Sequence, residues 1–123
     1  LVVDDEPNIV LSLEFLMSRA GFEVRIARDG REALAALRDE PPDVLLLDVM
    51  MPELDGFEVC EQIRARRPWD RTKIVMLTAR GREAERDRGL ALGADAYVTK
   101  PFSTRELVEQ IRAMLGVAPD ARA

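Results

Sequence analysis

Short apolar runs alternate with longer amphipathic segments along this chain of 123 residues. The apolar runs have the length of strands and span residues 1–3, 24–27, 44–47, 74–77 and 96–98. Between them lie helix-sized segments over residues 8–20, 31–38, 56–66, 82–92 and 104–115. In all of these except 82–92, apolar residues recur every three or four positions, as in helices that bury one face. Strict alternation of this kind predicts an α/β fold, a parallel sheet with helices on both faces.

The segment 82–92 differs from the other predicted helices because it is mostly charged until Leu90 and has hardly any apolar stripe. A helix with so few anchoring side chains can shift at low cost, which suits a signalling surface. A well-solvated helix held by charge pairs four residues apart explains the same pattern. The sequence leaves both interpretations open.

The composition is that of one ordinary globular domain, with 47% hydrophobic and 33% charged residues. A domain of this length buries enough surface to fold without disulfides or a structural metal. We expect it to span residues 1–116. Residues 117–123 contain glycine, proline and alanine without an apolar period, so we expect a C-terminal tail or the start of a linker. No apolar run approaches the roughly 18 residues that a membrane span needs.

The residue types exclude several kinds of chemistry. The chain has no histidine, which removes Ser-His-Asp and Cys-His catalysis and histidine zinc ligands from these residues. Its single cysteine, Cys60, lies on the apolar face of a predicted helix, where packing is the better interpretation than redox chemistry. The net charge of −5 disfavours direct binding of nucleic acid. Residues 64–71 are rich in arginine and surround Trp69. We expect this stretch to be a solvated helix end, because positive charges are favourable at the negative end of the helix dipole.

Polar residues stand where the predicted strands end. Asp4 and Asp5 follow the first strand, Asp48 follows the third, Thr78 follows the fourth, and Lys100 follows the fifth. In a parallel sheet these ends meet at one edge, outside which α/β proteins bind their ligands. We therefore expect three carboxylates, a hydroxyl and an ammonium group to converge there.

Three neighbouring carboxylates cannot all stay ionised without a cation, because each raises the pKa of the others. Lys100 offsets one charge, and the all-oxygen ligand set favours Mg²⁺ for the rest. Mg²⁺ uses one or two carboxylates and keeps waters, which leaves one aspartate available as a nucleophile. A carboxylate beside Mg²⁺, an ammonium and a hydroxyl suits phosphoryl transfer.

These residues lie within motifs that resemble the receiver (CheY-like) domain of bacterial two-component response regulators. The resemblance covers residues 1 to about 115, and its motifs together are very specific. They are Leu1-Val2-Val3-Asp4-Asp5-Glu6-Pro7, Leu46-Leu47-Asp48-Val49-Met50-Met51-Pro52 with Asp55-Gly56, Thr78-Ala79, Gly93-Ala94-Asp95, and Tyr97 with Lys100-Pro101-Phe102. The implied fold is the flavodoxin-like doubly wound (βα)5 fold with strand order 2-1-3-4-5.

The resemblance implies a role for each matching position. Asp48 corresponds to the phosphoacceptor, which shares Mg²⁺ with Asp4, Asp5 and the backbone carbonyl of Met50. Thr78 corresponds to the switch hydroxyl, Lys100 to the phosphate-contacting lysine, and Tyr97 to the switch aromatic. The peptide bond between Lys100 and Pro101 is implied to be cis, which X–Pro bonds tolerate.

The implied function is a phosphorylation switch in the cytoplasm. A sensor histidine kinase or a phosphotransfer protein would donate the phosphoryl group. The surface formed by the fourth helix, fifth strand and fifth helix would then act on an output domain or partner protein, without membrane contact. Such a module catalyses only its own phosphorylation and dephosphorylation, so we do not class it as an enzyme.

The same surface carries a salt-bridge ring in the dimers of the transcription-factor branch of the family. Arg86, Asp95 and Glu106 match that ring, whereas Ala96 and Gln110 depart from it. Each rim pair contributes only about 0–1 kcal/mol, but the set fixes the partner and the register. We therefore expect a monomer, or a weak dimer that depends on phosphorylation.

Two alternatives and one simpler interpretation stand beside this prediction. A haloacid-dehalogenase-type Mg²⁺-dependent phosphatase also uses an aspartate nucleophile, but it needs an acidic residue where this chain has Met50. A pseudo-receiver would bind a partner without phosphorylation, although all five site positions are intact. Without its partners, Asp4 would be interpreted as the N-cap of the first helix.

Overall fold

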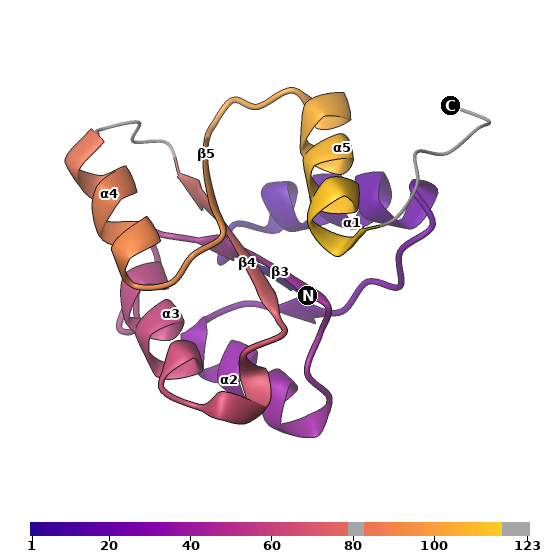
Figure 1. Ribbon diagram of the computed structural model, residues 1–123. Helices are drawn as coiled ribbons and strands as arrows, with labels where there is room; N and C mark the ends of the chain where they lie inside the picture. The colour runs from indigo at the N-terminus through magenta and orange to yellow at the C-terminus, as the bar shows by residue number, and fades with distance from the viewer. Residues whose placement is uncertain (79–82, 117–123) are drawn as a thin grey trace.

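The computed structural model describes residues 1–78 and 83–116, and its centre is a parallel sheet of five strands (Figure 1). The strands are β1 (Val2–Val3), β2 (Ile26–Ala27), β3 (Val44–Asp48), β4 (Lys73–Thr78) and β5 (Ala96–Thr99). They lie in the order β2-β1-β3-β4-β5, which confirms the expected flavodoxin-like topology. The expected C-terminal tail, 117–123, and Ala79 of the Thr78–Ala79 pair lie outside the described residues.

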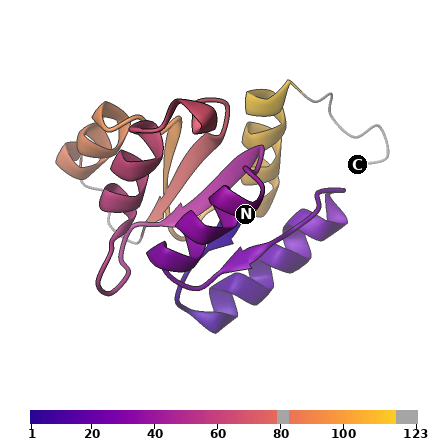
Figure 2. The same ribbon diagram turned by 90° about the horizontal axis from the view of Figure 1, so that it is seen from below.

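Helices cover both faces of the sheet, as the alternating pattern predicts (Figures 1 and 2). They are α1 (Pro7–Arg19), α2 (Gly30–Asp39), α3 (Gly56–Arg64), α4 (Glu83–Ala91) and α5 (Thr104–Leu115). α1 and α5 lie on one face, and α2, α3 and α4 lie on the other. A short 3₁₀ helix, η1 (Arg67–Trp69), follows α3 and was not expected from the periodicity. Within the described part of the chain, no helix is long and apolar enough to cross a membrane.

The core forms two layers because side chains along a strand alternate between the faces. Ile74 and Met76 of β4 pack into the layer under α2 and α3. Val75 and Leu77 of the same strand pack into the layer under α1 and α5. Their near-complete burial shows that β4 is covered on both faces, as the continuous apolar run in its sequence allows. Cys60 is fully buried in the first layer, so the packing interpretation is confirmed.

Side-chain caps explain where three of the helices begin. Asp29, Asp55 and Ser103 each accept a hydrogen bond from the backbone N–H three residues further on. Ser103 is the N-cap of the last helix, α5. Gly56 opens α3 directly against the backbone of Asp48, where a Cβ would lie 2.6 Å from the Asp48 carbonyl oxygen. Only glycine allows this approach, which fixes the loop after β3 beside its terminal aspartate.

The arginine-rich stretch after α3 is not simply a solvated helix end. Trp69 is 5% exposed and belongs to the core. Arg64 donates to the backbone oxygens of Trp69, Thr72 and Gly93 at 3.2, 2.8 and 2.9 Å, and to Asp95 Oδ2 at 3.0 Å. The prediction of a solvated cluster was therefore wrong for Arg64, because its long side chain reaches backbone oxygens 5, 8 and 29 residues further along the chain. We call these five residues the Arg64 network.

Candidate functional site

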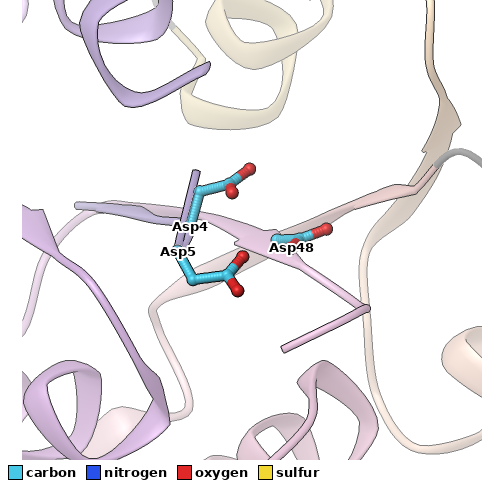
Figure 3. Close-up of side chains that lie close together, drawn as sticks. All are labelled: Asp4, Asp5 and Asp48. Carbon is cyan, nitrogen blue, oxygen red and sulfur yellow. The ribbon is translucent and has the colours of Figure 1, made fainter. Parts of the chain in front are cut away.

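Three carboxylates meet at the edge of the sheet where the strands end, which we call the carboxyl edge. Asp4 and Asp5 follow β1, and Asp48 is the last residue of β3. One oxygen from each lies within 4.8 Å of the others. Figure 3 shows the three carboxylates extending to the same side of this edge. Asp4 is 2% exposed and Asp48 is 5% exposed, whereas Asp5 faces solvent. The expected convergence of strand-end aspartates is present.

Lys100 is the cation of this cluster. Its Nζ donates to Asp4 Oδ2 at 3.2 Å and to Asp48 Oδ1 at 3.5 Å. The Lys100–Pro101 peptide bond that follows β5 is cis. The Lys100 ammonium therefore forms ion pairs with two buried carboxylates, and the described cluster carries more negative than positive charge.

The pKa of Asp48 reflects both its burial and this excess of negative charge. Burial raises the pKa of Asp48 from 3.8 to about 6, and the negative charge of Asp4 adds to the rise. Lys100 and the backbone N–H of Met50, which lies 3.4 Å from Asp48 Oδ1, oppose the rise in pKa without cancelling it. Asp48 is thus a carboxylate whose ionised form lacks compensating positive charge.

Asp4 is anchored by the start of α1 and does not cap it. The N-cap residue is Glu6, and Asp4 Oδ1 accepts a hydrogen bond from the Glu6 backbone N–H at 2.9 Å. Its other oxygen, Oδ2, faces Lys100. The N-cap interpretation of Asp4 is therefore wrong, because Asp4 lies two residues too early and points into the carboxylate cluster.

The arrangement of donors fits a hard divalent cation. All the ligand atoms are oxygens, two of the three carboxylates are buried, and the local charge is unbalanced. Mg²⁺ prefers this donor chemistry and retains water on its remaining positions, for which the exposed side of Asp5 leaves access.

Thr78 and Tyr97 lie on β4 and β5, the two strands that follow β3 in the sheet. Thr78 ends β4 and is fully buried. The hydroxyl of Tyr97, on β5, lies 3.5 Å from Oε2 of Glu85 on α4. Burial raises the pKa of Tyr97, and a hydrogen bond with Thr78 opposes that rise. A polar connection therefore runs from the strand end beside Asp48 to the surface of α4.

The family model of the response regulator receiver domain matches residues 1–112 of this chain. The chain belongs to the response regulator receiver domain family. Receiver domains are signalling modules with an acidic pocket that binds Mg²⁺, and the aspartate cluster has the composition of that pocket. The resemblance deduced from the motifs is thereby confirmed.

Individual relatives agree with this assignment. This receiver domain is 49% identical over 115 residues to the alkaline phosphatase synthesis transcriptional regulatory protein PhoP of Bacillus subtilis, covering 94% of this chain and 47% of that protein. The chain thus spans about half the length of this relative. Among solved structures it is similar to the receiver domain of the Francisella response regulator 1452, with 31% identity, a TM-score of 0.87 and coverage of 94% and 93%. Chemotaxis protein CheY4 of Vibrio cholerae matches with 34% identity, a TM-score of 0.86 and coverage of 92% and 94%.

These matches do not favour the phosphatase or the pseudo-receiver alternative.

Two features of the receiver domain were not found from its sequence. The sequence did not show that Arg64 binds Asp95, nor that Glu85 lies against Tyr97. Asp95 was expected in a dimer interface, but its Oδ2 accepts from Arg64 and from the Ile74 backbone N–H at 2.8 Å. The one available signal was the Gly93-Ala94-Asp95 motif, which precedes the fifth predicted strand but does not indicate a partner for Asp95.

Proposed function

We propose that this receiver domain acts in the cytoplasm as a switch and that Asp48 accepts the phosphoryl group. The single observation that carries the proposal is the position of Asp48: a buried strand-end carboxylate, within 4.8 Å of two others and facing one lysine. Burial and the negative charge of Asp4 raise the pKa of Asp48, and Lys100 does not cancel that rise. A phosphoryl group and a divalent cation together supply both the reactant and further positive charge.

Asp4, Asp5, Asp48 and the backbone carbonyl of Met50 would hold Mg²⁺. When bound, the ion supplies positive charge that offsets the oxygens of the phosphoryl group. Lys100, already within hydrogen-bond distance of Asp48, would donate to one of those oxygens. Few protein ligands are involved, so we expect weak binding of Mg²⁺ in the absence of phosphate.

The transfer itself exchanges one bond to phosphorus for another. A carboxylate oxygen of Asp48 attacks the phosphorus of a phosphohistidine, the P–N bond breaks, and the imidazole leaves with the electron pair. The donor imidazole belongs to a sensor histidine kinase or a phosphotransfer protein, since these 123 residues contain no histidine. Hydrolysis of the acyl phosphate by water later regenerates Asp48.

The switch would run through Thr78 and Tyr97. A phosphoryl group on Asp48 offers oxygens that accept a hydrogen bond from the Thr78 hydroxyl, which favours the conformation in which that contact is made. Tyr97 then loses or changes its hydrogen bond with Thr78. Because Tyr97 also contacts Glu85 on α4, the change reaches the surface formed by α4, β5 and α5. We propose that this surface contacts an output domain or a partner protein.

We propose a monomer before phosphorylation and at most a weak dimer afterwards. Arg64 and the Ile74 N–H both bind Asp95, which leaves that carboxylate less available for a partner copy. Ala96 and Gln110 supply no charge to a salt-bridge ring. Nothing in the acidic composition favours direct nucleic-acid binding by this domain.

Phosphorylation by a small donor tests the acceptor. Incubation with acetyl phosphate and Mg²⁺, followed by intact-mass measurement, is expected to add one phosphoryl group to the natural chain and none to Asp48→Asn. The matched control is Asp43→Asn, which changes an exposed aspartate just before the same strand and should label normally. Chelation of Mg²⁺ should abolish labelling. Labelling of Asp48→Asn, or labelling that survives chelation, would contradict the acceptor or the metal assignment respectively.

A further inference from the structure

The sequence pattern Asp-Gly-x-Glu occurs twice in this chain, each time at the start of a helix. Residues 29–32 open α2, and residues 55–58 open α3. In both, the aspartate is the N-cap and accepts a hydrogen bond from the backbone N–H of the glutamate, at 2.8 Å in α2 and 2.9 Å in α3. The caps are thus alike, and the two helix starts differ in what surrounds the glycine.

The glycine of α2 is crowded by side chains. A Cβ at Gly30 would lie 2.8 Å from Cγ2 of Val59 and 2.9 and 3.0 Å from Cδ2 and Cβ of Leu54. The two nearest of these atoms are the ends of side chains, and Leu54 is only half-buried. A larger residue at position 30 would therefore displace side chains that carry none of the proposed metal ligands.

The glycine of α3 is crowded by the backbone that carries Asp48. A Cβ at Gly56 would lie 2.6 Å from the Asp48 carbonyl oxygen and 2.7 Å from the Cα of Val49. The Gly56 N–H also donates to the Val49 carbonyl oxygen at 3.0 Å. Neither Gly30 nor Gly56 has a positive φ, so the close approach, and not the backbone conformation, requires glycine at position 56.

The backbone that Gly56 contacts has little freedom to move away. β3 pairs with β1 on one side and with β4 on the other. Beyond its end, the Val49 N–H donates to the Leu77 carbonyl oxygen at 3.1 Å, and Val49 is 2% exposed. A Cβ at position 56 would therefore strain the peptide between Asp48 and Val49, which moves together with the Asp48 carboxylate. It would also disturb Met50, whose N–H lies 3.4 Å from Asp48 Oδ1.

We propose that Gly56 is a positioning residue for the phosphoacceptor. It lets the first turn of α3 pack directly against the backbone of Asp48, and this contact sets where the Asp48 carboxylate and the Met50 carbonyl lie. The inference rests on the proposed function, because it names the residue that fixes the geometry of the proposed Mg²⁺ site. Mg²⁺ requires a near-ideal octahedron of ligands at about 2.0–2.1 Å, so a small displacement of two ligands weakens its binding.

Titration with Mg²⁺ alone, followed by the amide resonance of Met50, measures the effect on binding. Gly56→Ala should bind Mg²⁺ about tenfold more weakly than the natural chain, as is typical of changes just outside the ligands of a metal. The matched control, Gly30→Ala, adds the same methyl group at the same place of a helix start and should bind Mg²⁺ as the natural chain does. Urea denaturation shows that each variant is folded during the titration, so lost stability does not explain a difference in affinity.

An unchanged Mg²⁺ affinity in Gly56→Ala would overturn the proposal, and so would an equal loss in Gly30→Ala. Spectra without metal test the displacement itself. The resonances of Asp48 Cγ and of the Met50 amide should shift in Gly56→Ala and coincide with those of the natural chain in Gly30→Ala.

A second pair of variants applies if Gly56→Ala does not fold. Asp55→Ala removes the cap that holds the first turn of α3, whereas Asp55→Asn removes the same charge and keeps a capping oxygen. Asp55→Ala should bind Mg²⁺ several-fold more weakly than Asp55→Asn. Equal affinities for this pair would contradict the proposal.

Failure of the proposed function gives a different result. The Met50 amide of the natural chain would then not respond to Mg²⁺, and acetyl phosphate would not label Asp48. The spectra without metal would still decide whether Gly56 positions Asp48, because resonances of Gly56→Ala that coincide with those of the natural chain would overturn that inference.

Discussion

The two edges of the sheet both hold charged side chains in partly or fully buried positions, but they balance that charge differently. At the amino edge, where β4 and β5 begin, Arg64 makes four hydrogen bonds, and one of them pairs it with Asp95. At the carboxyl edge, the Lys100 ammonium forms ion pairs with two buried carboxylates, and a third carboxylate, that of Asp5, lies beside them. The first arrangement is complete within the chain, whereas the second requires additional positive charge.

This contrast separates stability from function. A charge that is paired and hydrogen-bonded within the chain holds segments together and gains little from a ligand. A charge left in excess costs free energy in the folded chain, and a cation or a reaction partner lowers that cost. The comparison leads us to expect stability losses from changes at the amino edge and stability gains, with loss of function, at the carboxyl edge.

The largest effect is expected at Arg64. Arg64→Ala removes four hydrogen bonds and leaves Asp95 and three backbone oxygens without that donor, so we expect the free energy of unfolding to fall by about 3 kcal/mol. Urea denaturation measures the loss. The matched control is Arg105→Ala, which breaks an ion pair of 3.2 Å with Glu109 on the exposed face of α5. That pair should contribute only about 0.3–0.5 kcal/mol.

Arg64→Lys sharpens the same test. Lysine keeps the charge but lacks the planar fork that reaches several oxygens at once, so most of the stability should still be lost. Equal losses for Arg64→Ala and Arg105→Ala would show that the Arg64 network does not stabilise the amino edge.

The second effect is a pH dependence at the carboxyl edge. The pKa of Asp48 is about 6 in the folded chain against an ordinary value of 3.8, so the folded state binds this proton more tightly than the unfolded state. The free energy of unfolding should therefore fall as the pH rises from about 4 to about 6, by about 1–3 kcal/mol from this group alone. Asp48→Asn should remove that part of the decline and be more stable than the natural chain at pH 7.

Denaturation in the presence of a chelator, repeated across this pH range, measures the effect without bound metal. Asp43→Asn should reproduce the curve of the natural chain, because its side chain is exposed. Parallel curves for the natural chain and Asp48→Asn would mean that folding does not raise the pKa of Asp48.

The smallest effect is expected at Thr72, whose backbone oxygen belongs to the Arg64 network. The Thr72 hydroxyl is buried and donates to the Pro42 carbonyl oxygen at 2.8 Å. Thr72→Val keeps the shape of the side chain and removes the donor, so the free energy of unfolding should fall by about 1 kcal/mol. Thr99→Val, at an exposed position of β5, should change it by less than about 0.5 kcal/mol. Similar values for both would show that the contact with Pro42 adds nothing.

Much of the candidate site could be predicted because topology brings the strand ends together. Once the alternating pattern indicates parallel strands, the residues that follow them must share an edge, whatever their separation in the sequence. Asp4, Asp48, Thr78 and Lys100 were found in this way and do lie there. Helix starts were equally accessible, because a cap such as Ser103 acts on an N–H only three residues away.

The sequence by itself thus determined the order of the elements, the parallel sheet and the edge that carries the chemistry, since local periodicity and strand-end residues encode them. The strand order 2-1-3-4-5 was implied by the family resemblance and not by these patterns. Only the tertiary structure decided which long side chains meet. Arg64 binds partners 29 and 31 residues away in the sequence. A Cβ at Gly89 would meet the sulfur of Met76 and the ring of Tyr97, which lie on other elements. A charged residue looks the same in a sequence whether it faces water or a buried carbonyl, and a glycine looks the same whether its missing side chain leaves space open or filled. The packing of the elements against one another distinguishes these cases, because burial and the identity of the neighbour set the energy of each contact.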